Sequence, residues 1–560
     1  MKNKILSIAF FVGCALCSCD DVLDALPEDK LPEETFWQTP GNVRAFVADV
    51  YSRAFPLEYE MHPCFDEAMS DNSWEGWYTD IKLVANGSYL TTTSVINNNW
   101  AYAYTNIRMA CQFLQNIEKC VELDTVEKES LTGQVRFFLA YSYIRLVALY
   151  GDVPLIEKVL TEGEAKVQTR TPKAEVLTFA HGQLDQAIKE LEGKTLEKGR
   201  VTVGACKALK ARAYLWENDY SNLLSVTSEL IGKYSLYTEG ETPYADLFNG
   251  NAEDADEIIL AREHTHTTGS ITTGNRLNQA FFLKEMSGGD ALRALTPTGS
   301  LVDAYPMADG RLIHESGSTY DPKDPYRDRD PRLAQSIIYP TSTIRESKTM
   351  TWVLYDPESE KSIPGQRYDA KEPSSSGYVW KKYCDWSDHA MIQILDGGVD
   401  VIYFRYADVL LMHAEALLET KGIAASSEIF AIINQLRDRC GGGRVTEANY
   451  TSEDALRTLV RNERRVELAN EGLRFFDIRR WKVAEKTVAV SGEGMNGEVY
   501  GAFMRLDGVG ATDRTVMVDG VPRRYVETYN FDPSKHYLFP IPSKDIDLTN
   551  GALSQNSGWD

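Results

Sequence analysis

The sequence predicts a mainly α-helical protein in which paired helices form a scaffold that holds long irregular segments and a few short β-strands. Apolar residues recur at helical spacing over most of residues 40–240, and the pattern returns from about residue 406. Between residues 241 and 400, Gly, Pro, Thr, Ser, Asp and aromatic residues dominate instead, which is typical of loops. A chain of 560 residues is long enough to bury a large core.

The clearest single helix lies before Gly151. Its apolar side chains recur at i, i+3 and i+4 spacing and so share one helical face. They are Val135, Phe138, Leu139, Tyr143, Leu146 and Leu149. The stretch Gly151-Asp152-Val153-Pro154 is expected to end this helix, because Gly favours the conformation that closes a helix and Pro cannot continue one.

Two further helix pairs are predicted from small residues at positions where helices meet. From Gly204 to Ile231, an Ala-rich helix is followed by a break at Asn218-Asp219 and a second helix. Later, a helix from Tyr406 to Glu419 ends near Gly422, and residues 427–439 supply its partner. The pattern resembles tetratricopeptide-type hairpins, although the full consensus is absent. We expect an α-solenoid-like scaffold with at least three helix pairs, two early and one late.

The irregular segments are expected to carry the function. Residues 241–400 contain short β-like runs such as Met350 to Tyr355, and residues 483–540 look similar, with Gly-rich turns around Gly492 and Gly508. Irregular segments of this length in a compact protein usually contribute to ligand binding or catalysis. We therefore place the ligand-binding residues in these loops.

The N-terminus has the layout of an export signal. Two lysines precede an apolar run from Ile5 to Leu16, which is shorter than the roughly 20 residues that a membrane-spanning helix needs. Leu16-Cys17-Ser18-Cys19 resembles a bacterial lipoprotein box, although Cys17 stands where Ala, Ser or Thr is commoner. Residues 1–18 are predicted to be a lipoprotein signal peptide and Cys19 the lipidated residue. A plain secreted protein is the alternative.

Charge and cysteine content exclude several functions. The net charge of −23 argues against a nucleic-acid partner, whose phosphates would be repelled. Six cysteines follow the signal region, none in a CxxC motif or at zinc-finger spacing from a His, so buried thiols are expected, with a disulfide left open. They are Cys64, Cys111, Cys120, Cys206, Cys384 and Cys440. We expect no metal ion and no cofactor.

Short motifs occur in a characteristic order along the whole chain. They are Gly133-Gln134-Val135-Arg136-Phe137, Tyr150-Gly151-Asp152-Val153-Pro154-Leu155, Asp330-Pro331-Arg332, Arg405-Tyr406-Ala407-Asp408, Glu463-Arg464-Arg465, Asp477-Ile478-Arg479-Arg480-Trp481 and Gln555-Asn556-Ser557-Gly558-Trp559. Their order resembles that of the SusD/RagB family of nutrient-binding outer-membrane lipoproteins of Bacteroidetes. The resemblance implies a SusD-like fold, with an N-terminal helical region over residues 19–240. It also implies a C-terminal region over residues 241–560 with loop-rich ligand-binding insertions.

The charged residues of these motifs are expected to be structural. The set is Arg136, Asp152, Asp330, Arg332, Arg405, Glu415, Glu463, Arg464, Glu467 and Arg480. Glu463, Glu467 and Glu471 are spaced to stack on one helical face, with nearby arginines as partners. Paired carboxylates can cleave glycosides, but adjacent guanidinium groups favour ionised, structural carboxylates. The sequence also lacks G-x-S-x-G and H-E-x-x-H motifs, so a non-catalytic protein is expected.

Aromatic residues in the loops are the candidates for ligand contact, because sugar rings stack their C–H faces on indole and phenol rings. The candidates are Asp71, Asn72, Trp74, Trp77, Tyr78, Phe281, Phe282 and Trp386. Asn and Asp side chains beside the rings could hydrogen-bond to hydroxyl groups. The alternative is that the tryptophans close the core beneath a loop. The family resemblance supports a binding region rather than individual residues.

The resemblance implies a surface lipoprotein that binds a glycan and passes it to a TonB-dependent transporter of the SusC type, acting as a non-catalytic lid. An N-terminal acyl chain such as palmitate on Cys19 would anchor it to the outer membrane, and the acidic pair Asp20-Asp21 suits the outer face. Three alternatives stay open. They are a peptide-binding lid of a RagAB-like importer, a helical-repeat scaffold without a small ligand, and a surface hydrolase.

Overall fold

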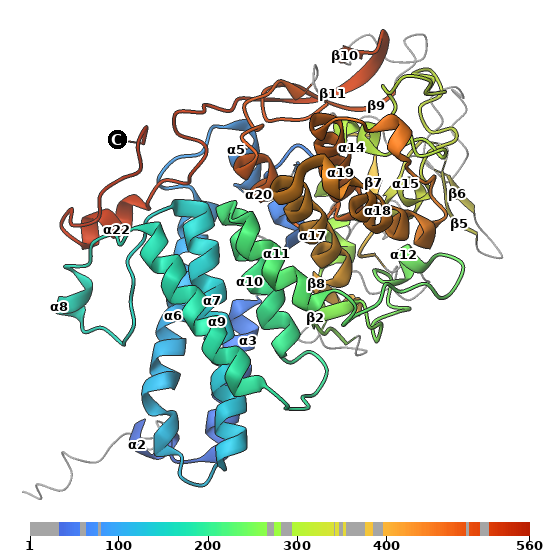
Figure 1. The fold of residues 1–560 in the computed structure, drawn as a ribbon. Helices are drawn as coiled ribbons and strands as arrows, with labels where there is room; N and C mark the ends of the chain where they lie inside the picture. The colour runs from blue at the N-terminus through green and yellow to red at the C-terminus, as the bar shows by residue number, and fades with distance from the viewer. Residues whose placement is uncertain are drawn as a thin grey trace, which may run out of the picture.

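Helices dominate the computed structural model (Figure 1). It describes residues 33–55, 63–76, 80–265, 274–281, 294–340, 342–346, 351–353, 376–384, 396–488, 492–503 and 514–559. The predicted signal peptide and Cys19 lie outside these residues. None of the helices within the described ranges is long and apolar enough to cross a membrane.

The first part of the chain is a set of long helices lying side by side (Figure 1). The helices up to residue 246 are α2 (Glu33–Phe36), α3 (Pro40–Ala54), α4 (Pro63–Glu67), α5 (Ile81–Asn86), α6 (Ser94–Asn116), the 3₁₀ turn η3 (Ile117–Lys119), α7 (Thr125–Tyr150), α8 (Glu162–Ala165), α9 (Lys173–Leu191), α10 (Val203–Glu217), α11 (Tyr220–Leu230) and α12 (Pro243–Asp246). The longest, α7, packs between α6 and α9.

The predicted ends of these helices are confirmed. α7 ends at Tyr150, and Gly151, at φ +76°, donates its N–H to the carbonyl of Val147. α10 ends at Glu217, and the next residue, Asn218, adopts the left-handed conformation (φ +58°). The Asp219 carboxylate then accepts a hydrogen bond from the Asn222 N–H and so caps α11. Local backbone chemistry therefore decides where this hairpin turns.

The later helices complete the scaffold. They are α13 (Leu277–Phe281), α14 (Gly299–Ala304), α15 (Pro331–Ser336), α17 (Tyr406–Lys421), η5 (Gly422–Ala425), α18 (Ser426–Cys440), η6 (Glu447–Asn449), α19 (Glu453–Glu467), α20 (Arg474–Arg480) and α22 (Ser543–Leu548). α17 and α18 form the predicted late pair, and α17 also packs against α11 of the early pair. The three pairs α6–α7, α10–α11 and α17–α18 confirm the helical scaffold.

The strands are short and form small antiparallel sheets. They are β1 (Ser73–Glu75), β2 (Ile258–Arg262), β3 (Leu295–Pro297), β4 (Ile337–Ile338), β5 (Thr343–Glu346), β6 (Thr351–Val353), β7 (Val379–Trp380), β8 (Val401–Arg405), β9 (Gly497–Phe503), β10 (Thr515–Val518) and β11 (Val521–Tyr529). The pairs are β1–β3, β2–β8, β4–β7 and β5–β6, and the run predicted at Met350 to Tyr355 contains β6.

The expectation of irregular structure over residues 483–540 is wrong in part. β10, β11 and β9 form a regular three-stranded sheet in that order. Asp519 (φ +51°) and Gly520 (φ +75°) form the two-residue hairpin between β10 and β11. Two successive residues at positive φ give the tight turn that matches strand twist, and an Asp-Gly pair is its usual sequence signal. Gly520 therefore belongs to a turn that connects two strands, not to an irregular loop.

One hydrophobic core extends through both halves of the chain. Phe55, after α3, stacks on Tyr403 of β8 with ring centroids 3.7 Å apart, and Phe137 of α7 contacts Phe404. The core has residues on both sides of position 240 and so does not mark a boundary there. The predicted division into regions 19–240 and 241–560 stays a prediction. The six described cysteines are buried and form no disulfide with one another, as expected for small apolar residues.

Candidate functional site

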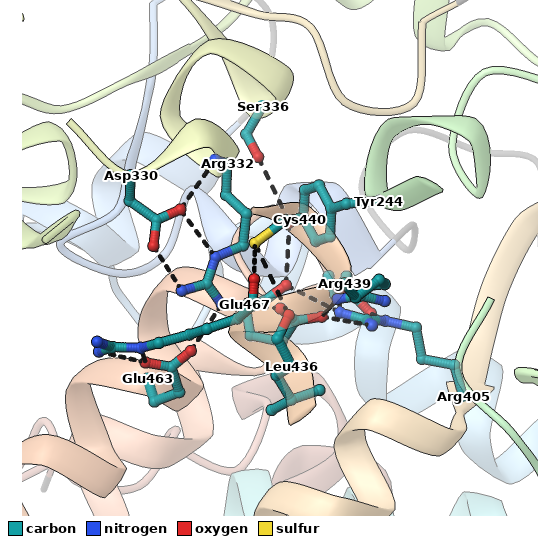
Figure 2. A network of polar contacts seen from close by, with 12 residues as sticks. Tyr244, Asp330, Arg332, Ser336, Arg405, Leu436, Arg439, Cys440, Glu463 and Glu467 are labelled. Atoms are coloured by element: carbon teal, nitrogen blue, oxygen red, sulfur yellow. Dashed lines mark hydrogen bonds and ion pairs between the residues drawn. The ribbon is translucent and has the colours of Figure 1, made fainter. Parts of the chain in front are cut away.

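A buried network of ion pairs lies where α19 ends (Figure 2). Glu467 contacts three guanidinium groups, at 2.9 Å from Arg332, 2.8 Å from Arg405 and 2.5 Å from Arg439. Each of these four side chains is fully buried. The three arginines come from α15, the end of β8 and α18. One carboxylate therefore ties three elements to α19.

Further acids neutralise these arginines. Arg332 also contacts Asp330 at 2.9 Å and Glu463 at 2.7 Å. Arg405 makes a bidentate pair with Glu471, with nitrogen-to-oxygen distances of 2.8 and 2.7 Å. Two parallel hydrogen bonds make this the stronger form of an Arg–carboxylate contact.

The outer contacts of the network use residues from other parts of the chain. Glu257 bridges Arg405 and Arg439, at 2.9 and 3.0 Å. Glu463 also contacts Arg437 at 2.8 Å, and Lys382 contacts Glu471 at 2.7 Å. The network therefore connects residues 257 to 471 across the second half of the chain.

The electrostatics keep these acids ionised. Burial alone would raise the pKa of Glu467, but the guanidinium groups of Arg439, Arg405 and Arg332 hold it well below its usual range. Burial is likewise outweighed at Glu471, where Arg405 and Lys382 lower the pKa of the carboxyl. A general acid must hold a proton near neutral pH. Glu467 and Glu471 are held as anions instead, which suits a structural role.

A second buried cluster joins α17, α19 and α20. Arg464 contacts Asp408 at 2.6 Å and Asp477 at 2.8 Å. Arg480 contacts Glu415 at 2.5 and 2.7 Å, and the indole N–H of Trp481 donates to the same carboxylate. Arg464 and Arg480, both predicted to be structural, thus hold the late helices together.

The pairing differs from the expectation in two ways. α19 ends at Glu467, so Glu471 lies beyond the helix and does not stack on its face. The partners of the three acids are not the arginines next to them in sequence but arginines from α15, β8 and α18. A helix turns neighbouring residues to different faces, so Arg464 and Arg465 point away from Glu463.

The early signature residues also have structural partners. Arg136 of α7 contacts Glu190 at 3.0 Å and Gln183 at 2.6 Å, both on α9. The Asp152 carboxylate accepts a hydrogen bond from the backbone N–H of Lys173 at the start of α9. These two contacts fix α7 against α9.

Three predicted ligand residues are buried instead. Asp71 and Asn72 have 0% exposure, and Trp74 has 6%. Asp71 pairs with Arg474 at 2.8 Å, and Trp74 lies in β1, where its indole N–H donates to Glu527 at 2.7 Å. Their assignment to an exposed binding loop is wrong, because β1 pairs with β3 and draws this segment inside. The core alternative describes Trp74 correctly.

Of the other predicted ligand residues, one lies in the core and the rest lie outside the described ranges. Phe281, in α13, has 0% exposure, so its assignment as a ligand contact is also wrong. Trp77, Tyr78, Phe282 and Trp386 lie outside the described residues, and their role stays a prediction. No group of His, Cys, Asp and Glu in the described ranges is arranged to hold a metal ion.

The structure brings together a group of tyrosines that sequence reasoning missed. We name it the tyrosine cluster: Tyr320, Tyr326, Tyr339, Tyr378 and Tyr500. The rings of Tyr326 and Tyr339 stack 4.7 Å apart at 15°, and both are half-buried. Tyr378 is buried beneath Tyr326, with ring centroids 6.3 Å apart and hydroxyl oxygens 3.2 Å apart. The cluster has a buried base and a partly exposed aromatic pair.

Polar partners fix the rest of the cluster. The Tyr500 hydroxyl donates to Asp303 at 3.0 Å, and Arg523 donates to the Tyr320 hydroxyl at 2.8 Å. These side chains come from α14, the 305–330 loop, β9 and β11, which lie together at one end of the molecule (Figure 1). Burial raises the pKa of Tyr378 and Tyr500 well above their usual value, so both hydroxyls stay protonated.

Arg329 holds the loop that carries Tyr320 and Tyr326. It is buried, and its guanidinium donates to four backbone carbonyls. The acceptors are Val302, Tyr305, Pro306 and Pro325. Satisfying these carbonyls keeps an otherwise irregular loop in one conformation. The only sequence signal for this site was the aromatic-rich texture of residues 241–400.

Two family models match this chain. The model described as "SusD family" matches residues 256–559, and the one described as "Starch-binding associating with outer membrane" matches residues 21–215. The first alone spans more than half of the chain and includes the ion-pair network. The chain belongs to the SusD family. The predicted family and fold are both confirmed.

Curated SusD-like relatives match over the full length. A SusD-like protein of Formosa agariphila is 23% identical over 100% of both chains. Another, of Bacteroides ovatus, is 21% identical and covers 99% of this chain and 98% of its own. The similarity to these two relatives therefore extends over at least 99% of this chain.

Solved SusD-like structures share the fold. A SusD-like protein of Bacteroides fragilis is 25% identical with a TM-score of 0.74, covering 95% of this chain and 100% of its own. A SusD-like carbohydrate-binding protein of the same species gives 24% and 0.77, with coverage of 92% and 99%. A laminarin-binding SusD-like protein gives 20% and 0.62, with coverage of 93% and 100%.

Proposed function

We propose that this SusD-family protein binds a glycan at the cell surface without cleaving it. The observation that carries the proposal is the half-buried stacked pair Tyr326–Tyr339 above a buried tyrosine base. Such a pair gives sugar rings an aromatic surface whose position is fixed before binding, which lowers the entropic cost of association. The names of two structural neighbours, a carbohydrate-binding and a laminarin-binding SusD-like protein, support the same ligand class.

The non-catalytic part of the proposal rests on the acids. The dense carboxylates at Glu463, Glu467 and Glu471 are all paired with buried cations. All three are buried in these ion pairs, so none of them is exposed to a bound sugar, as glycoside cleavage requires. Glycan turnover by the purified protein would contradict this part.

Delivery and anchoring complete the proposal. The protein would pass its glycan to a TonB-dependent transporter of the SusC type and act as a lid on it. A lipid on Cys19 would hold it at the outer face of the outer membrane. The lipoprotein box in the sequence and the description "associating with outer membrane" of the family model support this location. Mass spectrometry of the mature N-terminus tests the lipid, and co-purification with a barrel transporter tests the partner.

The binding experiment uses the chain from residue 20 onward and titrates a panel of glycans by calorimetry. We expect Tyr326→Ala and Tyr339→Ala each to weaken binding about 3- to 10-fold, the equivalent of an aromatic contact of about 0.5–1.5 kcal/mol. Tyr220→Ala is the matched control, because this half-buried tyrosine lies on α11, outside the tyrosine cluster. Its affinity should equal that of the wild type.

Two other outcomes would replace the proposal. Binding of peptides and of no glycan would favour the peptide-importer alternative. If the protein bound neither class and both tyrosine variants supported growth as the wild type does, a scaffold without a small ligand would be favoured. Melting temperatures of all variants should be measured alongside, so that loss of binding is separated from loss of folding.

A further inference from the structure

We propose that the tyrosine cluster takes an uncharged glycan and excludes carboxylated or sulfated ones; this rests on the proposed function. The inference comes from the charged groups around the cluster. A site for an anionic sugar needs a guanidinium or ammonium group whose hydrogen bonds are available to the ligand. The arginines described around the cluster use theirs within the protein.

The two buried arginines of the site are engaged by the fold. Arg329 spends its guanidinium on four backbone carbonyls of the loop. Arg523 donates to the Tyr320 hydroxyl and is 1% exposed. Neither can turn toward a ligand without breaking hydrogen bonds in the interior. The hydrogen bonds of these two guanidinium groups therefore hold the loop and the tyrosine rings in place.

The exposed basic residues of the loop are paired with acids. Arg327 lies 3.3 Å from Asp324 and 3.8 Å from Asp328. Arg311 lies 3.2 Å from Asp309 and donates to the Gly317 carbonyl at 2.6 Å. Of the four basic residues between positions 300 and 330, only Lys323 has neither an ion pair nor a hydrogen bond to a backbone carbonyl among the described residues, and aspartates stand on both sides of it in the sequence, at positions 321 and 324.

The net charge of this loop also opposes anions. Residues 300–330 contain seven acids and four basic residues, which gives 4 − 7 = −3 with His neutral. The acids are Asp303, Asp309, Glu315, Asp321, Asp324, Asp328 and Asp330, and the whole chain carries −23. Like charge on loop and protein lowers the local concentration of a polyanion. An uncharged sugar meets no such barrier.

The test is calorimetry on the chain from residue 20 onward with two glycan panels. The neutral panel is soluble starch, laminarin, xyloglucan and mannan; the anionic panel is polygalacturonate, alginate, chondroitin sulfate and heparin. We expect binding within the neutral panel alone, weakened about 3- to 10-fold by Tyr326→Ala. The affinity should change less than two-fold between 50 and 500 mM NaCl, because no ion pair forms.

A charge variant sharpens the result. Asp324→Asn with Asp328→Asn removes two exposed charges whose only recorded ion pairs are with Arg327. We expect neutral-glycan affinity to stay within two-fold. An anionic glycan that binds the wild type, loses affinity in Tyr326→Ala and weakens steeply with salt would overturn the inference and leave the proposed function standing. Binding of neither panel would overturn both.

Discussion

Glu467 is the side chain whose loss should weaken the fold most. Glu467→Gln removes one negative charge and keeps the side-chain volume, so the change isolates the electrostatic contribution. The variant leaves Arg332, Arg405 and Arg439 around a neutral amide, and its NH₂ group would face guanidinium donors. Breaking a buried ion pair by removing one partner costs about 3–5 kcal/mol. We expect a loss of that size.

The expected change in melting temperature follows from the size of the unit. Because one core extends through both halves, we take the whole chain from residue 20 onward, roughly 540 residues, as the cooperative unit, and its unfolding entropy is about 1.1 kcal/mol per kelvin. A loss of about 4 kcal/mol then lowers the melting temperature by about 3.5 °C. The assay is differential scanning calorimetry, with urea unfolding for the free energy. Glu453→Gln in the exposed first turn of α19 is the matched control and should cost at most about 1 kcal/mol.

The pH dependence provides a second readout. Because the pKa of Glu467 is depressed in the folded protein, its stabilisation is present above the unfolded pKa of about 4.5 and is lost as the pH falls below it. The difference between wild type and Glu467→Gln should therefore shrink in acid. A variant as stable as Glu453→Gln at pH 7, or a difference that grows below pH 4.5, would refute the structural role of the network.

Three further changes test other parts of the structure. Burial raises the pKa of Glu67 to about 7, so the free energy of unfolding should fall by about 3 kcal/mol as the pH rises from about 4.5 to 7. In urea unfolding at several pH values, Glu67→Gln should remove this pH dependence. An unchanged pH dependence in the variant would contradict the assignment. Gly472→Ala should lower the free energy of unfolding by at least about 2 kcal/mol more than Gly193→Ala does. Both glycines have positive φ, but only an alanine at position 472 would place its Cβ 2.3 Å from the Pro63 carbonyl oxygen. Equal losses would show that this contact relaxes freely. The six buried thiols should react slowly with Ellman's reagent in the native chain from residue 20 onward and completely after unfolding, and a reductant should leave the melting temperature unchanged; rapid native reaction would place a thiol at the surface.

The sequence predicted the helical frame because its signals are local. The apolar spacing before Gly151 and the break at Asn218-Asp219 act through neighbouring residues, and α7, α10 and α11 begin and end accordingly. The structural role of Glu467 and Arg480 was also predicted, because a buried carboxylate needs a cation. Neither conclusion required knowledge of the tertiary structure.

The partners within the network could not be predicted in the same way. Glu467 meets Arg332, which is 135 residues away in the chain, and Arg405, which is 62 residues away. The sequence places Arg464 and Arg465 much closer, and helix geometry turns both of them elsewhere. Pairing of buried charges depends on which elements pack together, and no local pattern records that.

The binding site shows the same division. The sequence by itself determined a helical scaffold, buried ionic clusters and an aromatic-rich middle region, because periodicity and composition are properties of short segments. Only the tertiary structure decided that Trp74 closes the core against β11 while Tyr326 and Tyr339 form a partly exposed pair. Exposure is set by which segments cover a side chain, and those segments come from far along the chain.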